Sequence, residues 1–190
     1  MISRFIPLAA TLAFVAGCST VNHAANEVGE TAGDVAAEVN APHATATLMD
    51  AAGATVGTAG FAQHEGSVRV EVKVKGLPAG EHGVHLHEVG TCTSPDFASA
   101  GGHFNPAQKQ HGLSNPAGPH AGDMPNLTVG PDGSGELEFS DDRVTLNDGP
   151  NSLFDADGTA IVVHAGPDDQ MSDPSGNSGG RVACGVVTKG

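Results

Sequence analysis

Six histidines and one aspartate in this chain fall at spacings that indicate a metal site. Imidazole and carboxylate groups are the ligands that borderline metals such as copper and zinc prefer. The residue types and their order therefore predict a metalloprotein. The candidate ligands are His85, His87, His103, His111, His120, Asp123 and His164.

The first two candidates lie in the sequence Gly-Val-His-Leu-His-Glu-Val, which is typical of a strand. Side chains two residues apart on a strand point to the same face, so His85 and His87 can bind one ion together. A lone His-x-His pair is also compatible with a surface strand without metal, but five further ligand-type residues favour the metal site. His82 lies at an odd spacing from His85, so we expect it to face away, at the surface.

Four strands and a hairpin support an all-β fold. Val68, Val70, Val72 and Val74 alternate with charged residues, as in a half-buried strand. Apolar residues on either side of a Gly/Pro/Asp turn predict a hairpin. No stretch of this part of the chain shows a helical period that would predict a helix instead. The predicted strands outside the valine run cover residues 83–89, 127–129, 137–139, 160–164 and 182–187.

Two stretches do not read as strands, residues 89–124 and 165–180. Both are rich in Gly, Pro, Asp, Asn and Ser. Loops of this length in a compact domain are usually functional, and the first contains most of the candidate ligands. A metal ion that holds several points of the first loop would explain how so glycine-rich a segment stays ordered.

Length and charge limit the possible functions. A chain of 190 residues is long enough for one well-buried domain and too short for two. The formal net charge of -14 argues against nucleic-acid binding, which needs a basic surface. An anionic substrate would need a local positive charge to overcome the overall field.

The first seventeen residues are predicted to be a targeting segment. Arg4 precedes a short apolar run, which ends in Val-Ala-Gly-Cys18 and resembles the lipobox of bacterial lipoproteins. In such proteins the peptide is cut before the cysteine, whose sulfur is acylated. The alternative is an ordinary secretory signal in which Cys18 is incidental. The run is too short for a membrane-spanning helix.

Cysteine usage agrees with export. Three cysteines are an odd number for an exported chain. If Cys18 carries lipid, Cys92 and Cys184 remain and suit one disulfide in an oxidising compartment. Such a bridge closes a long loop and would stabilise the fold by about 4 to 5 kcal/mol in the chain-entropy model. Cleavage would remove Arg4, the one charged residue in 1–17, and shift the formal net charge from -14 to -15.

Residues 18–42 are predicted to comprise the lipidated cysteine and a flexible tether, or else a short helix. The domain proper is expected at 43–190. Ser19 follows the cysteine, and the usual sorting pattern then points to the outer membrane. We therefore expect a protein of the bacterial cell envelope, facing the periplasm and anchored through Cys18.

Six motifs, taken together, resemble copper/zinc superoxide dismutase of the bacterial exported lipoprotein type. Each motif alone is weak, but the ordered set is specific and covers about 43–190. The motifs are Gly-Val-His-Leu-His (83–87), Gly-Gly-His-Phe-Asn-Pro (101–106), His-Gly (111–112), Gly-Pro-His-Ala-Gly-Asp (118–123), Val-His (163–164) and Gly-Arg-Val-Ala-Cys-Gly (180–185).

The resemblance implies an eight-stranded Greek-key β-barrel (an immunoglobulin-like sandwich) with two long functional loops. It implies that copper is bound by His85, His87, His103 and His164. It implies that zinc is bound by His103, His111, His120 and Asp123. His103 would bridge both ions as an imidazolate, and Asp168 would link His85 to His111 as an outer carboxylate. Asp168 has a simpler alternative, that of capping a turn.

The implied activity is the dismutation of superoxide to dioxygen and hydrogen peroxide, which would protect the cell envelope. Copper would change its oxidation state while zinc stays fixed, and His103 would take up and deliver a proton. Arg181 would dock the anion, with Lys109 as a weaker candidate, and a Cys92–Cys184 bridge would help to place Arg181. The loop 165–180 has no lysine, so the charged steering segment of eukaryotic members is absent.

Two other functions stay open at this point. One is a copper-binding or storage module without turnover, and the other is an inactive structural member of the fold. Every ligand and the anion-docking arginine are present, which favours the enzyme. Without Trp or Tyr there is no obvious aromatic interface, so both a monomer and a homodimer fit the sequence.

Overall fold

The computed structural model describes residues 43–190 of the chain. The targeting segment (1–17), Cys18 and the tether up to residue 42 lie outside the described residues. Those assignments stay predictions. The described part corresponds to the domain expected from residue 43 onward.

Antiparallel strands make up this domain, and its one described helical element is a 3-10 turn, η1 (Ala98–Ala100). Within 43–190, no helix combines the length and the apolar character needed to cross a membrane. The strands are β1 (His43–Asp50), β2 (Thr55–His64), β3 (Ser67–Lys75), β4 (Gly80–His82), β5 (Val84–His87), β6 (Leu127–Val129), β7 (Ser134–Asp141), β8 (Ala160–His164), β9 (Arg181–Val186) and β10 (Thr188–Lys189).

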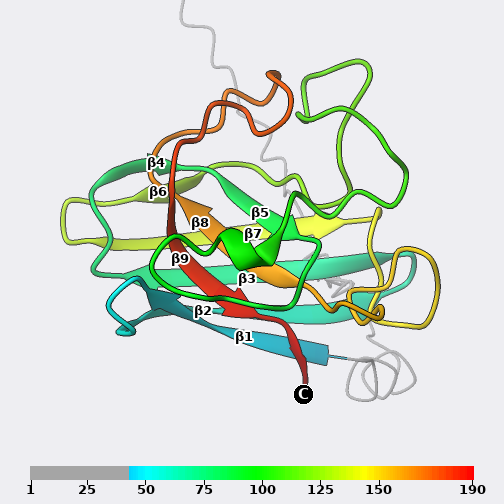
Figure 1. Cartoon of the computed structure of the whole chain (residues 1–190), viewed down its shortest axis with the longest axis horizontal. Helices are drawn as coiled ribbons and strands as arrows, with labels where there is room; N and C mark the ends of the chain where they lie inside the picture. Colours follow the sequence, from blue (N-terminus) through cyan, green and yellow to red (C-terminus); the bar gives the residue numbers. More distant parts are fainter. Residues whose placement is uncertain (1–42) are drawn as a thin grey trace, which may run out of the picture.

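The strands form one antiparallel sheet that curls into a nearly closed barrel (Figure 1). Its order is β4-β6-β7-β3-β2-β1-β9-β8-β5, with β10 paired to β1. Strands β4 and β5 are divided only at Gly83, so both ends of this order belong to one stretch of chain. When β4 is counted with β5 and β9 with β10, eight strands result. Crossing connections bring β3 beside β7 and β1 beside β9, so the predicted Greek-key barrel is confirmed.

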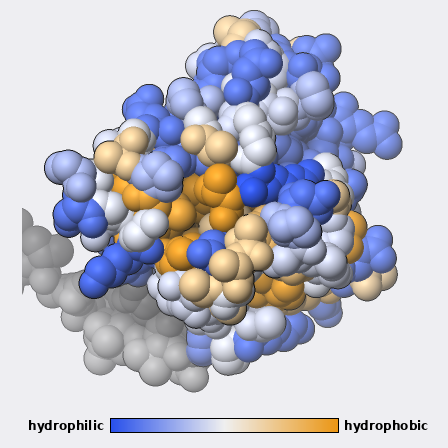
Figure 2. All heavy atoms as spheres, turned by 60° about the vertical axis from the view of Figure 1, so that its left-hand side comes forward, coloured by the Kyte–Doolittle hydropathy of each residue, from blue (hydrophilic) through white to orange (hydrophobic). Residues whose placement is uncertain are grey.

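Aliphatic side chains fill the barrel because they alternate along its strands. In β3, the valines of the predicted strand are all buried, with at most 4% of each exposed, and the residues between them face outward. Figure 2 shows apolar side chains gathered in the middle of one face, with hydrophilic side chains around them. The exposed large hydrophobic residues of the described domain are Leu113, Met171 and Val186.

Strand β8 is buried on both faces, which explains its unbroken apolar sequence. Ile161 and Val163 belong to the barrel core, whereas the residues that alternate with them belong to a second cluster outside it. The predicted disulfide between Cys92 and Cys184 is confirmed, and it ties the long loop to β9. The second cluster consists of Phe97, Ala100, Ala160, Val162 and Cys184, with Cys92 packed against it.

The two predicted loops contain no strand. The first part of the 89–124 loop, with η1, packs against the outer side of β8 and β9, whereas its later part lies beside the 165–180 loop, in green and orange at the top of Figure 1. They are joined by hydrogen bonds. Ser114 N donates to the carbonyl oxygen of Gln170 (3.0 Å), and His111 N donates to Asp173 Oδ1 (2.7 Å). These hydrogen bonds hold the later part of the first loop against the second loop.

Candidate metal centre

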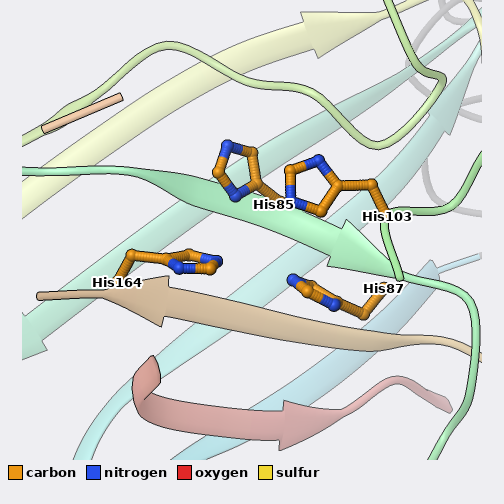
Figure 3. Close-up of side chains that lie close together, drawn as sticks. All are labelled: His85, His87, His103 and His164. Carbon is orange, nitrogen blue, oxygen red and sulfur yellow. The ribbon is translucent and has the colours of Figure 1, made fainter. Parts of the chain in front are cut away.

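Four histidines from two strands and one loop surround a common point. His85 and His87 come from β5, and His164 ends β8, which pairs with β5. His103 comes from the long loop, where it forms an isolated bridge with His87. Figure 3 shows the four rings close together, and one ligand atom of each lies within 4.8 Å of the others. We call these residues the four-histidine group.

Three of these rings are oriented by a hydrogen bond from one nitrogen to an oxygen. Such a bond fixes the tautomer, so the other nitrogen presents a lone pair. The donors and acceptors are His85 Nε2 to Asp168 Oδ2 (2.8 Å), His87 Nδ1 to the carbonyl of Gly101 (3.0 Å), and His164 Nδ1 to the carbonyl of Gly179 (3.2 Å).

The remaining nitrogens show that a metal fits this group. Six buried side-chain nitrogen or oxygen atoms of the described domain lack a hydrogen-bond partner, and four of them are ring nitrogens of the four-histidine group. An unpaired buried polar group costs about 1–3 kcal/mol, so four together call for a shared partner. A borderline cation bound by imidazole satisfies all four at once. The four atoms are His85 Nδ1, His87 Nε2, His103 Nε2 and His164 Nε2.

A second set of ligands meets around one carboxylate oxygen. Asp123 Oδ1 lies 3.0 Å from His103 Nδ1, 3.0 Å from His111 Nδ1 and 3.2 Å from His120 Nδ1. The Nδ1 atoms of His103 and His120 are 3.3 Å apart. Zinc with ligands at about 2.0–2.1 Å has tetrahedral edges of roughly 3.3 Å, so these separations fit the ion. We call His103, His111, His120 and Asp123 the aspartate group.

His85 also lies near this second set. One ligand atom each of His85, His103, His111 and Asp123 fall within 4.8 Å of one another. However, His85 Nε2 is engaged by Asp168, and its Nδ1 is one of the four unpartnered nitrogens. His120 is in direct contact with both His103 and Asp123. We therefore assign His120, and not His85, to the aspartate group.

His103 belongs to both groups through its two nitrogens. Its Nε2 is unpartnered among the four histidines, whereas its Nδ1 faces Asp123. Backbone hydrogen bonds fix the chain beside this ring, because Phe104 N donates to the carbonyl of Leu86 in β5, and Leu86 N donates to the carbonyl of Gly122. The loop is thereby attached to the strand that carries the first two ligands.

Asp168 contacts a ligand of each group. Its Oδ2 accepts from His85 Nε2 (2.8 Å), and its Oδ1 accepts from His111 Nε2 (3.0 Å). It also caps a turn, because Gln170 N donates to Oδ1 (2.6 Å). Asn126 fixes its backbone from both sides, with Nδ2 donating to the carbonyl and Oδ1 accepting from the amide.

Burial and charge set the protonation states of these groups. Burial lowers the pKa of His85 to about 3, of His87 to about 2 and of His164 to about 4, so these rings are neutral at pH 7 and available as ligands. Burial also lowers the pKa of His103, against the opposing effect of Asp123.

The two groups bonded to each other behave differently. Burial alone would lower the pKa of His111, but hydrogen bonds to Asp123 and Asp168 outweigh it and raise that pKa to about 9. Burial opposes ionisation of Asp168, yet hydrogen bonds from His111 and His85 hold its pKa well below the usual range.

Arg181 is the permanent positive charge beside the four-histidine group. It pairs with His164 in the β8–β9 register, and its guanidinium donates to the carbonyls of Phe97 and Gly101 (2.6 Å each). Burial lowers its pKa, but arginine stays protonated in proteins. The carbonyl of Gly101 also accepts from His87 Nδ1. One backbone oxygen therefore orients both a candidate ligand and the guanidinium.

Comparison with known proteins agrees with this geometry. Residues 55–187 match the family described as copper/zinc superoxide dismutase (SODC). The chain belongs to that family. Superoxide dismutase [Cu-Zn] 1 of Aquifex aeolicus is 48% identical over 144 residues, which are 75% of this chain and 85% of that protein. Superoxide dismutase [Cu-Zn] of Deinococcus radiodurans is 41% identical over 165 residues, 79% of this chain and 86% of that one.

Solved structures agree with the fold. The crystal structure of a SOD-like protein from Bacillus subtilis superimposes with a TM-score of 0.72 at 37% identity, over 75% of this chain and 96% of that one. As a copper/zinc superoxide dismutase, the chain is an oxidoreductase, and its family uses copper and zinc. The predicted family, enzyme class and cofactors are thus confirmed.

One expectation about this superoxide dismutase was wrong. His82 is not at the surface but only 2% exposed, and its ring nitrogens lie 2.7 Å from the carbonyl oxygen of His164 and 2.9 Å from that of Pro78. The odd spacing failed because Gly83 divides the strand. Strand β4 pairs with β6, whereas β5 pairs with β8, so the alternation does not run from His82 to His85.

Several residues that shape the site were missed. Asn126 and Gly176 position Asp168, the carbonyl of Gly101 orients His87, and Arg143 contacts the aspartate group from the barrel. No ligand-type pattern marks them, because an amide, a glycine and a backbone carbonyl act here through long-range contacts. Arg143, one of few basic residues in an acidic chain, was the one available signal.

Gly176 gives a direct test of the Asp168 link. Its φ is +61°, and an added Cβ would overlap Asp168 Oδ1 and lie 2.7 Å from His111 Nε2. We expect Gly176→Ala to separate these two groups and to weaken metal retention by about 10-fold or more. The measurement is copper and zinc content after dialysis against a graded chelator.

The matched control is Gly180→Ala in the same loop, where an added Cβ meets nothing within 4 Å. It should retain both metals as the unmodified protein does. Equal metal retention in the two variants would refute the positioning role of Gly176.

Proposed function

We propose that this superoxide dismutase binds copper in the four-histidine group and zinc in the aspartate group. The proposal rests on His103, whose Nε2 is unpartnered on one side while its Nδ1 faces Asp123 on the other. A site of imidazoles alone suits copper, and three imidazoles with a carboxylate suit zinc. The ring of His103 then serves both ions.

The protein's own groups bind the substrate and handle its protons. Bound copper supplies the one-electron oxidation and reduction of superoxide, whereas zinc has no redox chemistry here. His103 Nε2 would take up one proton from solvent after the first half-reaction and give it to the second superoxide, and a second proton from solvent would complete hydrogen peroxide. The Nδ1 of His103 meanwhile stays with Asp123, which keeps the ring in position. Asp168 holds His85 and His111 in their orientations throughout.

Arg181 docks the anion. Arginine has five N–H donors, and the carbonyls of Phe97 and Gly101 use one on Nη1 and one on Nη2. The others are available to superoxide, since Arg181 is partly exposed. In a chain of formal net charge -14, the positive charge of Arg181 must provide most of the electrostatic attraction for superoxide.

Replacing Arg181 tests this role. We expect Arg181→Ile to retain both metals, because no candidate ligand is lost, and to lower the rate constant with superoxide by about 10-fold, as loss of a charged hydrogen bond predicts. Pulse radiolysis measures that rate constant directly. Arg69→Ile is the control, because Arg69 lies on β3 in a surface pair with Glu138 (3.0 Å). An unchanged rate in Arg181→Ile would exclude the docking role.

Metal removal tests the catalytic assignment as a whole. Purified protein should contain about one copper and one zinc per chain, as the two ligand groups require. Superoxide consumption should disappear when copper is withdrawn and return when it is restored, while zinc alone restores nothing. Stoichiometric copper without turnover would instead favour the copper-storage function.

We infer that the protein acts in the bacterial envelope as a lipoprotein and protects that compartment from superoxide. Support comes from the charged and apolar segment before Val-Ala-Gly-Cys18 and from the Cys92–Cys184 disulfide, which persists in oxidising compartments. Ser19 favours sorting to the outer membrane.

Cys18→Ser tests the anchor. In a bacterial host, the native chain should incorporate labelled palmitate and sediment with membranes. The variant should incorporate none, because the acylated sulfur is missing. Cys92→Ser is the matched cysteine control and should keep the label. Labelling of Cys18→Ser at the native level would exclude this site of attachment, and separation of the two membranes would test the sorting.

A further inference from the structure

The guanidinium of Arg143 joins the barrel to the aspartate group. Strand β7 ends at Asp141, and Arg143 lies two residues beyond it. Arg143 Nε donates to Asp141 Oδ1 (2.7 Å) and Nη2 donates to Oδ2 (3.0 Å). On its other side, Nη1 donates to the carbonyl of His120 (3.0 Å) and Nη2 to the carbonyl of Asp123 (2.7 Å).

This contact is built into the interior of the fold. The side chain of Asp141 is fully buried and that of Arg143 is 21% exposed. Burial raises the pKa of Asp141, and the hydrogen bonds from Arg143 act against that shift. The guanidinium also lies 5.7 Å from the centre of the Phe139 ring in β7. Residues of β7 therefore hold the guanidinium of Arg143 in the orientation in which it contacts the loop.

The two carbonyls belong to candidate zinc ligands. His120 and Asp123 form one short turn, in which Asp123 Oδ2 accepts from His120 N (2.9 Å). The inner side of this turn is attached to β5 through the hydrogen bond from Leu86 N to the carbonyl of Gly122. Arg143 fixes it from the other side. With both contacts, the turn can present His120 Nδ1 and Asp123 Oδ1 at a defined separation.

We propose that Arg143 is a positioning residue that sets the zinc affinity of the aspartate group, by holding the His120–Asp123 turn against the barrel. This rests on the proposed assignment of zinc to that group. A planar fork is needed, because four acceptors surround one guanidinium. Lysine has three donors at a single point and cannot reach all four.

The test measures zinc binding in the full chain. Metal-free protein is titrated with zinc against a chromophoric chelator, and separately with Co²⁺, whose absorption reports tetrahedral coordination. We expect Arg143→Gln to bind zinc about 10- to 100-fold more weakly, as for other groups that orient ligands, and to alter the Co²⁺ spectrum. Arg69→Gln, in the surface pair with Glu138, should change neither.

Thermal unfolding separates positioning from general stability. A residue that only stabilises the barrel would lower the Tm of metal-free and zinc-loaded protein equally. A positioning residue reduces the difference between them. If Arg143→Gln does not fold, Arg143→Lys and the Asp141→Asn/Arg143→Gln double variant, which leaves no buried charge unpaired, are measured in its place. Both should bind zinc more weakly.

Native affinity and an unchanged Co²⁺ spectrum in any folded variant at Arg143 would overturn the inference. That outcome differs from failure of the proposed function, in which the unmodified protein would show no zinc or cobalt binding at the aspartate group.

Discussion

The site depends on burying imidazole nitrogens that have no hydrogen-bond partner within the described domain. Four such atoms, on His85, His87, His103 and His164, are gathered in one place. At about 1–3 kcal/mol for each unpaired group, their combined cost is comparable to the net stability of a whole domain. A fold can carry that cost only where packing elsewhere is strong. It also follows that a bound cation stabilises this fold, because it removes the cost in the folded state alone.

Different interactions stabilise the barrel and the loops. The barrel is held by aliphatic packing, for example by the buried valines of β3, and its strand pairing places the backbone of the histidines of β5 and β8. Loop oxygens then orient the three rings. The first loop is anchored by Phe104, Ala121 and Met124 in the barrel core and by Phe97 and its neighbours in the second cluster, whereas the rest of both loops is held by hydrogen bonds, many of them to backbone carbonyls. Ligands that lie in such a loop need polar anchors such as Asn126, or the metal itself, to keep their geometry.

What the sequence could predict follows from the range of each interaction. Alternation along a strand is local, so the valines of β3 and the pairing of His85 with His87 could be read directly. The same rule failed at His82, because Gly83 interrupts the strand and hydrogen bonding changes partner there. The close approach of Gly176 to His111 and the hydrogen bond from Arg143 to the carbonyl of Asp123 join segments that are far apart in the chain. No local sequence pattern predicts such contacts.

Gly101 connects metal binding to anion docking. Its carbonyl accepts from His87 Nδ1 (3.0 Å) and from Arg181 Nη2 (2.6 Å), so a single oxygen fixes the separation between a ligand ring and the guanidinium. Its φ is +74°, and an added Cβ would meet the Glu88 side chain at 2.8 Å. The loop that carries it is tied by the Cys92–Cys184 disulfide to β9, the strand that begins with Arg181. Gly101 and Arg181 thus both lie in the segment that the disulfide closes, and the disulfide limits how far the guanidinium can move from the ligand ring of His87.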